Sequence, residues 1–84
     1  MKHDSESTEQ DRPHRVLGRR ISTQRRAVFL TQAALAERMG LTQSAIARWE
    51  TGECEPALRH RLRLAQELMI SPHVLFETAQ AVAS

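Results

Sequence analysis

Apolar residues recur at helical spacing along most of this 84-residue chain. Leu17 and Ile21 share one face of a helix that begins near residue 16, because residues three or four positions apart lie on the same side of a helix. Leu58, Leu62, Ala65 and Leu68 share one face of a helix over residues 57–69 for the same reason. The same pattern predicts further helices over residues 32–39, 43–51 and from residue 72 onward. Residues 1–13 are polar and show no periodicity, which predicts a disordered tail.

Capping residues mark the boundaries of these helices. Thr31 and Thr42 each precede a predicted helix, where a hydroxyl oxygen can accept a hydrogen bond from a backbone N–H of the first turn. Ser71, followed by a proline, is a third cap of this kind. Gly40 and Gly52 follow two of the helices, where glycine adopts the left-handed conformation that ends a helix at little cost.

Residues 30–39 (LTQAALAERM) and 41–50 (LTQSAIARWE) are similar to each other, with one glycine between them. Solenoid repeats need units of at least about 20 residues and several copies, so this is not a solenoid. We interpret the two segments as short helices joined by a tight glycine turn, a helix-turn-helix whose second helix lies in the DNA major groove. The residues expected to hold the two helices at a fixed angle are Leu35, Ala36, Met39, Leu41, Ile46 and Trp49.

The composition favours a small all-α domain. Aromatic residues make up 4% of the chain, and there are three glycines and three prolines, which is few for a sheet protein rich in turns. Cys54 is the single cysteine, so an intramolecular disulfide is excluded, and the four histidines lack the spacing of metal ligands. We expect a soluble cytoplasmic protein without cofactor, metal, membrane span or signal peptide.

Basic residues are concentrated in the first predicted helix. Residues 14–30 contain five arginines and no acidic residue, whereas residues 1–13 contain four acidic residues against two basic ones. An arginine-rich helix is either a solvated face or a surface that binds phosphate groups. Beside a helix-turn-helix we expect phosphate contact, for which the candidates are Arg15, Arg19, Arg20, Arg59 and Arg61.

Four fragments in order give the chain a family resemblance. LGRRI opens the first helix, LTQAALAERMGLTQSAIARWE forms the motif, WETGECEP closes it, and LRLAQELMISPHVLF follows. The chain thereby resembles the Cro/C1-type helix-turn-helix domain of phage repressors and small bacterial regulators, from about residue 17 to residue 77. The resemblance implies a compact five-helix bundle of the lambda-repressor type over residues 15–77. Residues 1–14 would be a disordered acidic tail and residues 78–84 a tail or helix extension.

The resemblance also implies roles for residues of the two motif helices. Gln32 matches a glutamine that binds a phosphate together with the adjacent helix N-terminus, and Thr42 is a second phosphate candidate. A glutamine pairs bidentately with adenine and an arginine with guanine, each pair being worth roughly 1–3 kcal/mol of discrimination. The positions that match the family's base readers are Gln43, Ser44, Ala47 and Arg48. For Arg48, phosphate contact remains the alternative.

Two further positions match a structural pair of the family. Arg25 lies late in the first helix, and Glu50 follows the last inward-facing residue of the recognition helix. The resemblance implies an ion pair between them that ties these two helices together.

Several positions depart from the family pattern. Gln24 interrupts the apolar stripe of the first helix. Phe29 stands where glycine is common, so either the turn is built differently or Phe29 packs into a core. Glu53 and Glu55 occupy a loop that is usually basic, which weakens the expected phosphate contact there. Cys54 in the same loop is either redox-sensitive or an incidental exposed cysteine.

Together these features predict a sequence-specific DNA-binding transcriptional regulator, a repressor that binds a palindromic operator as a homodimer. We expect it in the bacterial cytoplasm, associated with the nucleoid, with double-stranded DNA as its partner. Dimerisation is inferred from operator symmetry in the family. It is also inferred from apolar residues near the C-terminus that could equally belong to the core, namely Leu64, Met69, Ile70, Val74, Phe76 and Val82.

Two other functions stay open. The chain could be the antitoxin of a toxin–antitoxin pair, which would bind a protein partner as well as DNA. It could also be a protein-interaction adaptor that lost DNA binding, an alternative that the acidic loop favours and Gln32 and Gln43 oppose. An enzyme finds no support, because the sequence contains no nucleophile–base pair, metal cluster or phosphate-binding loop.

Overall fold

The computed structural model describes residues 14–77. The two predicted tails, apart from residue 14, lie outside the described residues. Within the described part the chain forms five helices and no strand, so the predicted all-α five-helix fold is confirmed. The helices are α2 (Arg15–Ala27), α3 (Gln32–Met39), α4 (Gln43–Thr51), α5 (Leu58–Glu67) and α6 (Pro72–Phe76).

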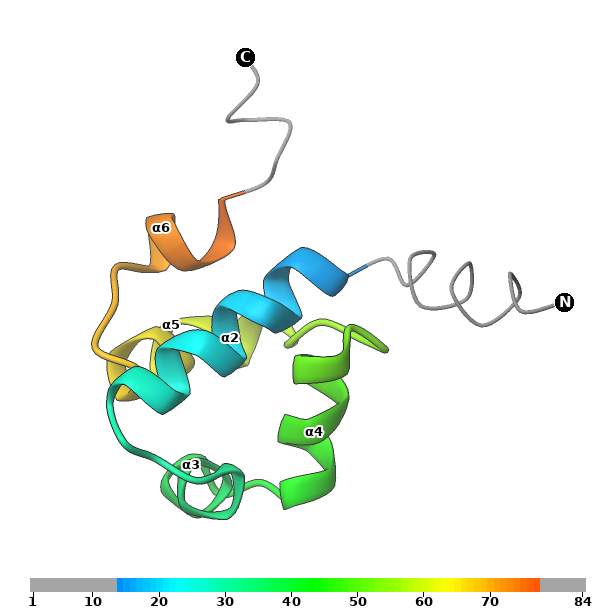
Figure 1. The fold of residues 1–84 in the computed structure, drawn as a ribbon, viewed down its shortest axis with the longest axis vertical. Coiled ribbons are helices and arrows are strands. Elements are labelled where there is room, and N and C mark those ends of the chain that lie inside the picture. The colour runs from blue at the N-terminus through cyan, green and yellow to red at the C-terminus, as the bar shows by residue number, and fades with distance from the viewer. Residues whose placement is uncertain (1–13, 78–84) are drawn as a thin grey trace, which may run out of the picture.

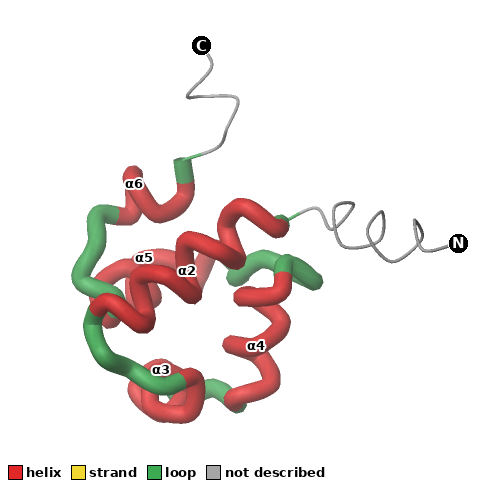
Figure 2. The backbone as a smooth tube through the Cα atoms, viewed as in Figure 1, coloured by secondary structure: helices red, strands yellow, loops and turns green. Residues whose placement is uncertain are grey.

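Helix α2 lies at the centre of the arrangement (Figure 1). It packs mainly against α4, and α3 packs against α4 in turn, while α5 contacts both α3 and α6. Short loops join the consecutive helices (Figure 2). The α3–α4 pair therefore forms one corner of the molecule, with α2 bracing it from behind.

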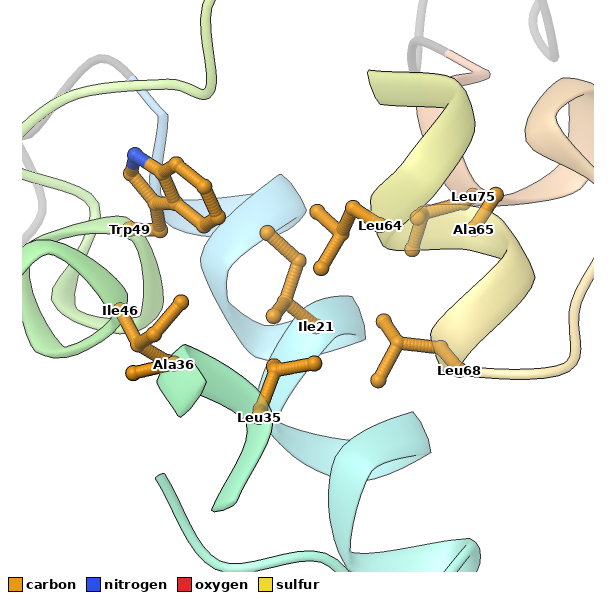
Figure 3. Close-up of a cluster of buried hydrophobic side chains, with 9 residues drawn as sticks. All are labelled: Ile21, Leu35, Ala36, Ile46, Trp49, Leu64, Ala65, Leu68 and Leu75. Carbon is orange, nitrogen blue, oxygen red and sulfur yellow. The ribbon is translucent and has the colours of Figure 1, made fainter. Parts of the chain in front are cut away.

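The core is built from side chains of every helix (Figure 3). Ile21 of α2 lies between the side chains of α4 on one side and those of α5 on the other. The buried cluster consists of Ile21, Leu35, Ala36, Ile46, Trp49, Leu64, Ala65, Leu68 and Leu75. Because the positions expected to join the motif helices are buried or pack on this cluster, burial of apolar surface holds α3 and α4 in place.

The inner face predicted for the helix over 57–69 is partly wrong. Leu58 is 79% exposed and Leu62 is 60% exposed, although both have the expected helical spacing. Ala65 and Leu68 of the predicted face are buried, and Leu64, which the prediction did not place on that face, is buried with them. The face that a helix buries depends on where its neighbours lie, and periodicity alone does not settle this when two apolar stripes are present.

The caps of the two motif helices form as predicted. Thr31 Oγ1 accepts a hydrogen bond from the backbone N–H of Ala34 at 3.0 Å, and Thr42 Oγ1 accepts one from Ala45 at 3.2 Å. Gly40 and Gly52 end α3 and α4 in the left-handed conformation, with φ of 69° and 83°. Before α6, Ser71 is the N-cap residue and a proline follows in the first turn, as predicted, although the serine side chain makes no cap hydrogen bond.

Helices α2 and α5 also end at a left-handed residue, although neither end has a glycine. Phe29 has φ 63° and Met69 has φ 57°. In both cases the next N–H bonds to a carbonyl five residues earlier, Leu30 to Arg25 and Ile70 to Ala65, each at 3.1 Å. Phe29 is 93% exposed, so the turn is built differently from the family pattern and the alternative of a packed Phe29 is wrong.

Gly18 allows α2 to approach α4 closely. A Cβ atom at this position would lie 2.5 Å from the carbonyl oxygen of Glu50 and 2.6 Å from that of Trp49. Both are backbone atoms, which cannot rotate out of the way as a side chain can. The glycine is therefore required by helix packing, since its φ is not in the left-handed region.

We expect Gly18→Ala to lower the stability of the protein by about 1–3 kcal/mol, because the methyl group forces α2 and α4 apart. The measurement is thermal unfolding followed by circular dichroism. Thr23→Ala, at an exposed position of the same helix, is the control and should be neutral or slightly stabilising, since alanine has the better helix propensity. Equal melting temperatures for the two variants would contradict the close packing.

Candidate nucleic-acid interface

The N-terminal ends of α3 and α4 present a polar surface. Gln32 is the first residue of α3 and Gln43 the first residue of α4. The Nε2 of Gln43 donates a hydrogen bond to Oε1 of Gln32 at 3.4 Å, so the two helix starts lie side by side. Thr42 and Ser44, beside Gln43, are exposed. This corner offers amides, hydroxyls and free backbone N–H groups to a ligand with acceptors.

Helix α4 has two contrasting faces. Ile46 and Trp49 point into the core, while the predicted base-reading residues lie on the other side. Of these, Gln43, Ser44 and Arg48 are exposed and Ala47 is partly exposed. Arg48 lines a shallow hollow together with Glu53 and Cys54 of the following loop. The outer face of α4 can therefore enter a groove without disturbing the core.

The ion pair between Arg25 and Glu50 is present and almost fully buried. Arg25 Nε and Nη2 donate to the two carboxylate oxygens of Glu50 at 2.5 and 3.0 Å, and the side chains are 10% and 6% exposed. Arg25 Nη1 also donates to the carbonyl oxygen of Leu30 at 2.8 Å. One guanidinium thus joins α2, α4 and the loop before α3.

Its hydrogen bond to Glu50 raises the pKa of the Arg25 guanidinium; burial opposes this rise, and the charge of Glu50 adds to it. A pKa that is higher in the folded chain supplies stability that is complete below the ordinary pKa of arginine. That stability is lost only as the pH rises through the folded value, far above neutrality. The arginine therefore keeps its charge at neutral pH.

Gln32 connects this buried pair with the surface. Its Nε2 donates to Oε1 of Glu50 at 2.9 Å, while its Oε1 accepts from Gln43. The family resemblance implies that Gln32 is a phosphate ligand and Glu50 a partner of Arg25, and the sequence gives no sign that Gln32 and Glu50 touch. A bond between residues 18 positions apart on different helices has no periodic signature that a single sequence could reveal.

Two of the arginines predicted to contact phosphate are engaged within the fold. Arg20 donates to the carbonyl oxygens of Leu75, at 3.3 Å, and Glu77, which ties α2 to α6. Arg61 donates to the carbonyl oxygen of Pro56 at 3.2 Å, and its guanidinium lies 5.0 Å from the centre of the Phe76 ring.

The other three predicted phosphate ligands have a different environment. Arg15, Arg19 and Arg59 form no ion pair with a carboxylate within residues 14–77. Arg19 lines a hollow of about 380 Å³ between α2 and α6, together with Ile70 and Val74.

The acidic loop is partly neutralised within the fold. Glu55 lies 3.2 Å from Arg61 Nη2 and 3.6 Å from His14 Nδ1. Glu53 remains exposed beside Arg48 and Cys54. Glu55 thus acts as a bridge between the start of α2 and α5, a role that its position in a loop did not indicate.

Residues 21–75 match the protein-family model described as Helix-turn-helix. The chain belongs to this family. The resemblance to Cro/C1-type helix-turn-helix domains is thereby confirmed.

Two curated repressors are similar to this helix-turn-helix chain. The repressor protein C2 of Salmonella phage P22 is 36% identical over 62 residues, 74% of this chain and 29% of that protein. The cryptic phage CTXphi transcriptional repressor RstR of Vibrio cholerae is 33% identical over 52 residues, 62% of this chain and 46% of that protein. The chain spans less than half the length of either relative.

Two solved structures resemble the helix-turn-helix fold described above. The restriction-modification controller protein C.AhdI from Aeromonas hydrophila has a TM-score of 0.66 and 37% identity, covering 71% of this chain and 91% of that one. The P22 c2 repressor, solved in complex with a synthetic operator, has a TM-score of 0.69 and 36% identity, covering 73% and 92%.

The described part of the chain shows neither a metal centre nor a membrane-spanning helix. No group of histidine, cysteine, aspartate or glutamate side chains is arranged there to hold a metal ion. None of the helices α2–α6 has the length and apolar character needed to cross a membrane.

We expect Glu50→Ala to lower the stability by about 3–5 kcal/mol, because it leaves the Arg25 charge buried without its partner. Glu53→Ala removes the same charge from an exposed position and is the control, for which a change within about 0.5 kcal/mol is expected. Both are measured by urea unfolding at neutral pH. A Glu50→Ala protein as stable as the control would show that the pair does not brace α2 against α4.

Proposed function

We propose that this helix-turn-helix chain is a sequence-specific DNA-binding transcriptional regulator that represses by occupying operator DNA. The observation that carries the proposal is the outer face of α4, which presents Gln43, Ser44 and Arg48 to solvent while its inner face is locked into the core. A rigid helix with exposed polar side chains is what major-groove recognition requires. The two curated relatives are both repressors, which supports this direction of regulation.

In this proposal the outer face of α4 reads bases. Gln43 pairs with adenine, Arg48 with guanine, and the methyl group of Ala47 contacts a thymine methyl. Ser44 accepts or donates one hydrogen bond. Gln32 and Thr42, at the helix starts, contact phosphates on either side and set the register on the duplex.

The arginines proposed to contact phosphate form two groups, which differ in whether the side chain already has a partner within the fold. Arg15, Arg19 and Arg59 have side chains that could reach a phosphate without breaking an ion pair within the described residues. Arg20 and Arg61 would have to give up their internal partners first. Each phosphate neutralised makes the slope of log affinity against log salt more negative by about 0.9, so the binding should weaken steeply with salt.

We further propose that residues 15–77 form the DNA-binding domain and that two copies bind a palindromic operator. A two-fold symmetric operator matches a two-fold symmetric dimer. Of the apolar residues predicted for dimerisation, Met69 is 78% exposed and Val74 is 51% exposed, whereas Leu64 belongs to the core. Val82 lies outside the described residues. This function would place the protein in the cytoplasm, at the nucleoid.

The deciding experiment is selection from a random duplex library at about 150 mM salt, followed by sequencing. We expect enrichment of an inverted repeat with half-sites about one helical turn apart, since that spacing presents two recognition helices to one face of the DNA. A single enriched half-site would retain the regulator and remove the dimer. A folded protein that enriches no sequence would contradict the proposed function.

The same selection tests base reading by Gln43. We expect Gln43→Ala to lose the preference at one base pair of each half-site, by roughly five- to hundredfold, and to keep the rest of the enriched sequence. Gln66→Ala, which removes the same amide from an exposed position of α5, is the control and should leave the sequence unchanged. If Gln43→Ala retained every preference of the parent chain, Gln43 would not be a base reader.

A further inference from the structure

We propose that Glu50 is a positioning residue for DNA sequence recognition, which acts through Gln32 to fix the atoms of the Gln43 amide that face the groove. This inference rests on the proposed function, and it assigns to Glu50 a second role besides its ion pair with Arg25. It also predicts which base Gln43 accepts and which it rejects.

The first step is set by the carboxylate. Glu50, ion-paired with Arg25, carries acceptors alone, because an ionised carboxylate has no proton to donate. Its Oε1 lies 3.0 Å from Arg25 Nη2 and 2.9 Å from Gln32 Nε2. If the amide of Gln32 were turned round, its oxygen would face the carboxylate oxygen, and two acceptors would repel each other. Glu50 therefore fixes the orientation of the Gln32 amide.

The second step transfers this orientation to the surface. With its NH₂ group turned toward Glu50, Gln32 has its Oε1 turned toward Gln43, whose Nε2 lies 3.4 Å away. A carbonyl oxygen accepts and does not donate, so Gln43 must present its NH₂ group to Gln32. The Oε1 of Gln43 and its second N–H remain available for a ligand.

The burial of the three side chains indicates that the buried end of this hydrogen-bonded chain sets the orientation of the exposed end. Glu50 is almost fully buried, Gln32 is half-buried and Gln43 is exposed. An unpaired acceptor or donor is most costly where water is excluded, so the buried end of the chain sets the arrangement and the exposed end follows it. The orientation thus exists before DNA arrives.

The oriented amide discriminates between the two purines. In the major groove adenine offers the N6 amino donor and the N7 acceptor, which match Oε1 and the free N–H of Gln43. Guanine offers two acceptors, O6 and N7, and the fixed Oε1 would face O6. A glutamine that could turn freely would instead offer its NH₂ group to guanine. The hydrogen-bonded chain therefore favours adenine over guanine at this base pair.

The test uses the full chain and two duplexes that differ in the base pair located by Gln43→Ala, one with A·T and one with G·C. The measured quantity is the dissociation constant for the G·C duplex divided by that for the A·T duplex, so that a larger ratio means a stronger preference for adenine. Gln32→Met keeps the length of the side chain and the ion pair but removes the amide, and we expect the preference for adenine to fall by about tenfold. Loss of a phosphate contact by Gln32 would weaken both duplexes equally and leave the ratio unchanged. Gln66→Met is the control and should behave as the parent.

Glu50 itself is tested by a double-mutant cycle. Glu50→Gln should lower the ratio in the parent chain, because an amide can face Gln32 with its NH₂ group and allow both glutamines to turn. In the Gln32→Met background it should lower the ratio no further, since coupled residues are non-additive. Arg25→Lys weakens the ion pair and leaves the Glu50 carboxylate in place. This variant should therefore be less stable than the parent but have the same ratio of dissociation constants. Melting curves fix an assay temperature at which each variant is folded.

The outcomes separate this inference from the proposed function. A parent chain that binds neither duplex would overturn both. Binding with a ratio that Gln32→Met does not change would overturn the positioning role and leave the regulator. Equal effects of Glu50→Gln in the two backgrounds would show that Glu50 does not act through Gln32. If Arg25→Lys lowered the ratio as much as Glu50→Gln, the role of Glu50 would be structural only.

Discussion

The buried Arg25–Glu50 ion pair is the interaction on which the geometry of the recognition surface depends. Its guanidinium meets the carboxylate through two nitrogen atoms and the backbone of Leu30 through a third. Removing two charges from water offsets much of the attraction between them, so such a pair adds little net stability compared with apolar side chains of the same size. What the pair adds is a defined orientation of the two helices, because the planar guanidinium of an arginine fits a carboxylate in few arrangements. The angle between α2 and α4 follows from that constraint.

Close packing acts together with the ion pair. Gly18 lets the backbone of α2 lie against the carbonyl oxygens of Trp49 and Glu50, and the Glu50 side chain then reaches Arg25 one helix away. A larger residue at position 18 would move the carboxylate as well as the helix. The surface that reads DNA in the proposed function is therefore held by contacts on the opposite side of α4. Stability and recognition share the same residues here.

The departures from the family pattern are accommodated by contacts between distant segments. Gln24, which interrupts the apolar stripe of α2, donates its amide to the carbonyl oxygen of Leu68 at 2.9 Å and so caps the end of α5. Phe29 and Met69 take the left-handed conformation in place of glycine, at a cost of roughly 1–2 kcal/mol each. The cost is tolerated because the core packing of α2 and α5 fixes where these helices end.

The sequence by itself determined the elements of this protein. Periodicity, two threonine caps and two glycines were enough to place α3 and α4, because helix propensity, capping and glycine turns depend on neighbouring residues. The choice of base-reading candidates on α4 came from the family resemblance. The pairing of Arg25 with Glu50 came from the family pattern.

Only the tertiary structure decided which apolar stripe of α5 is buried, that Arg20 and Arg61 hold α6, and that Gln32 touches Glu50. Each of these contacts joins residues on different elements, and it exists because the packing of the whole core brings them together. A local sequence pattern does not reveal which residues of different elements come into contact. For the same reason, the direction of the Gln43 amide depends on a carboxylate seven residues away in sequence and on another helix's glutamine between them.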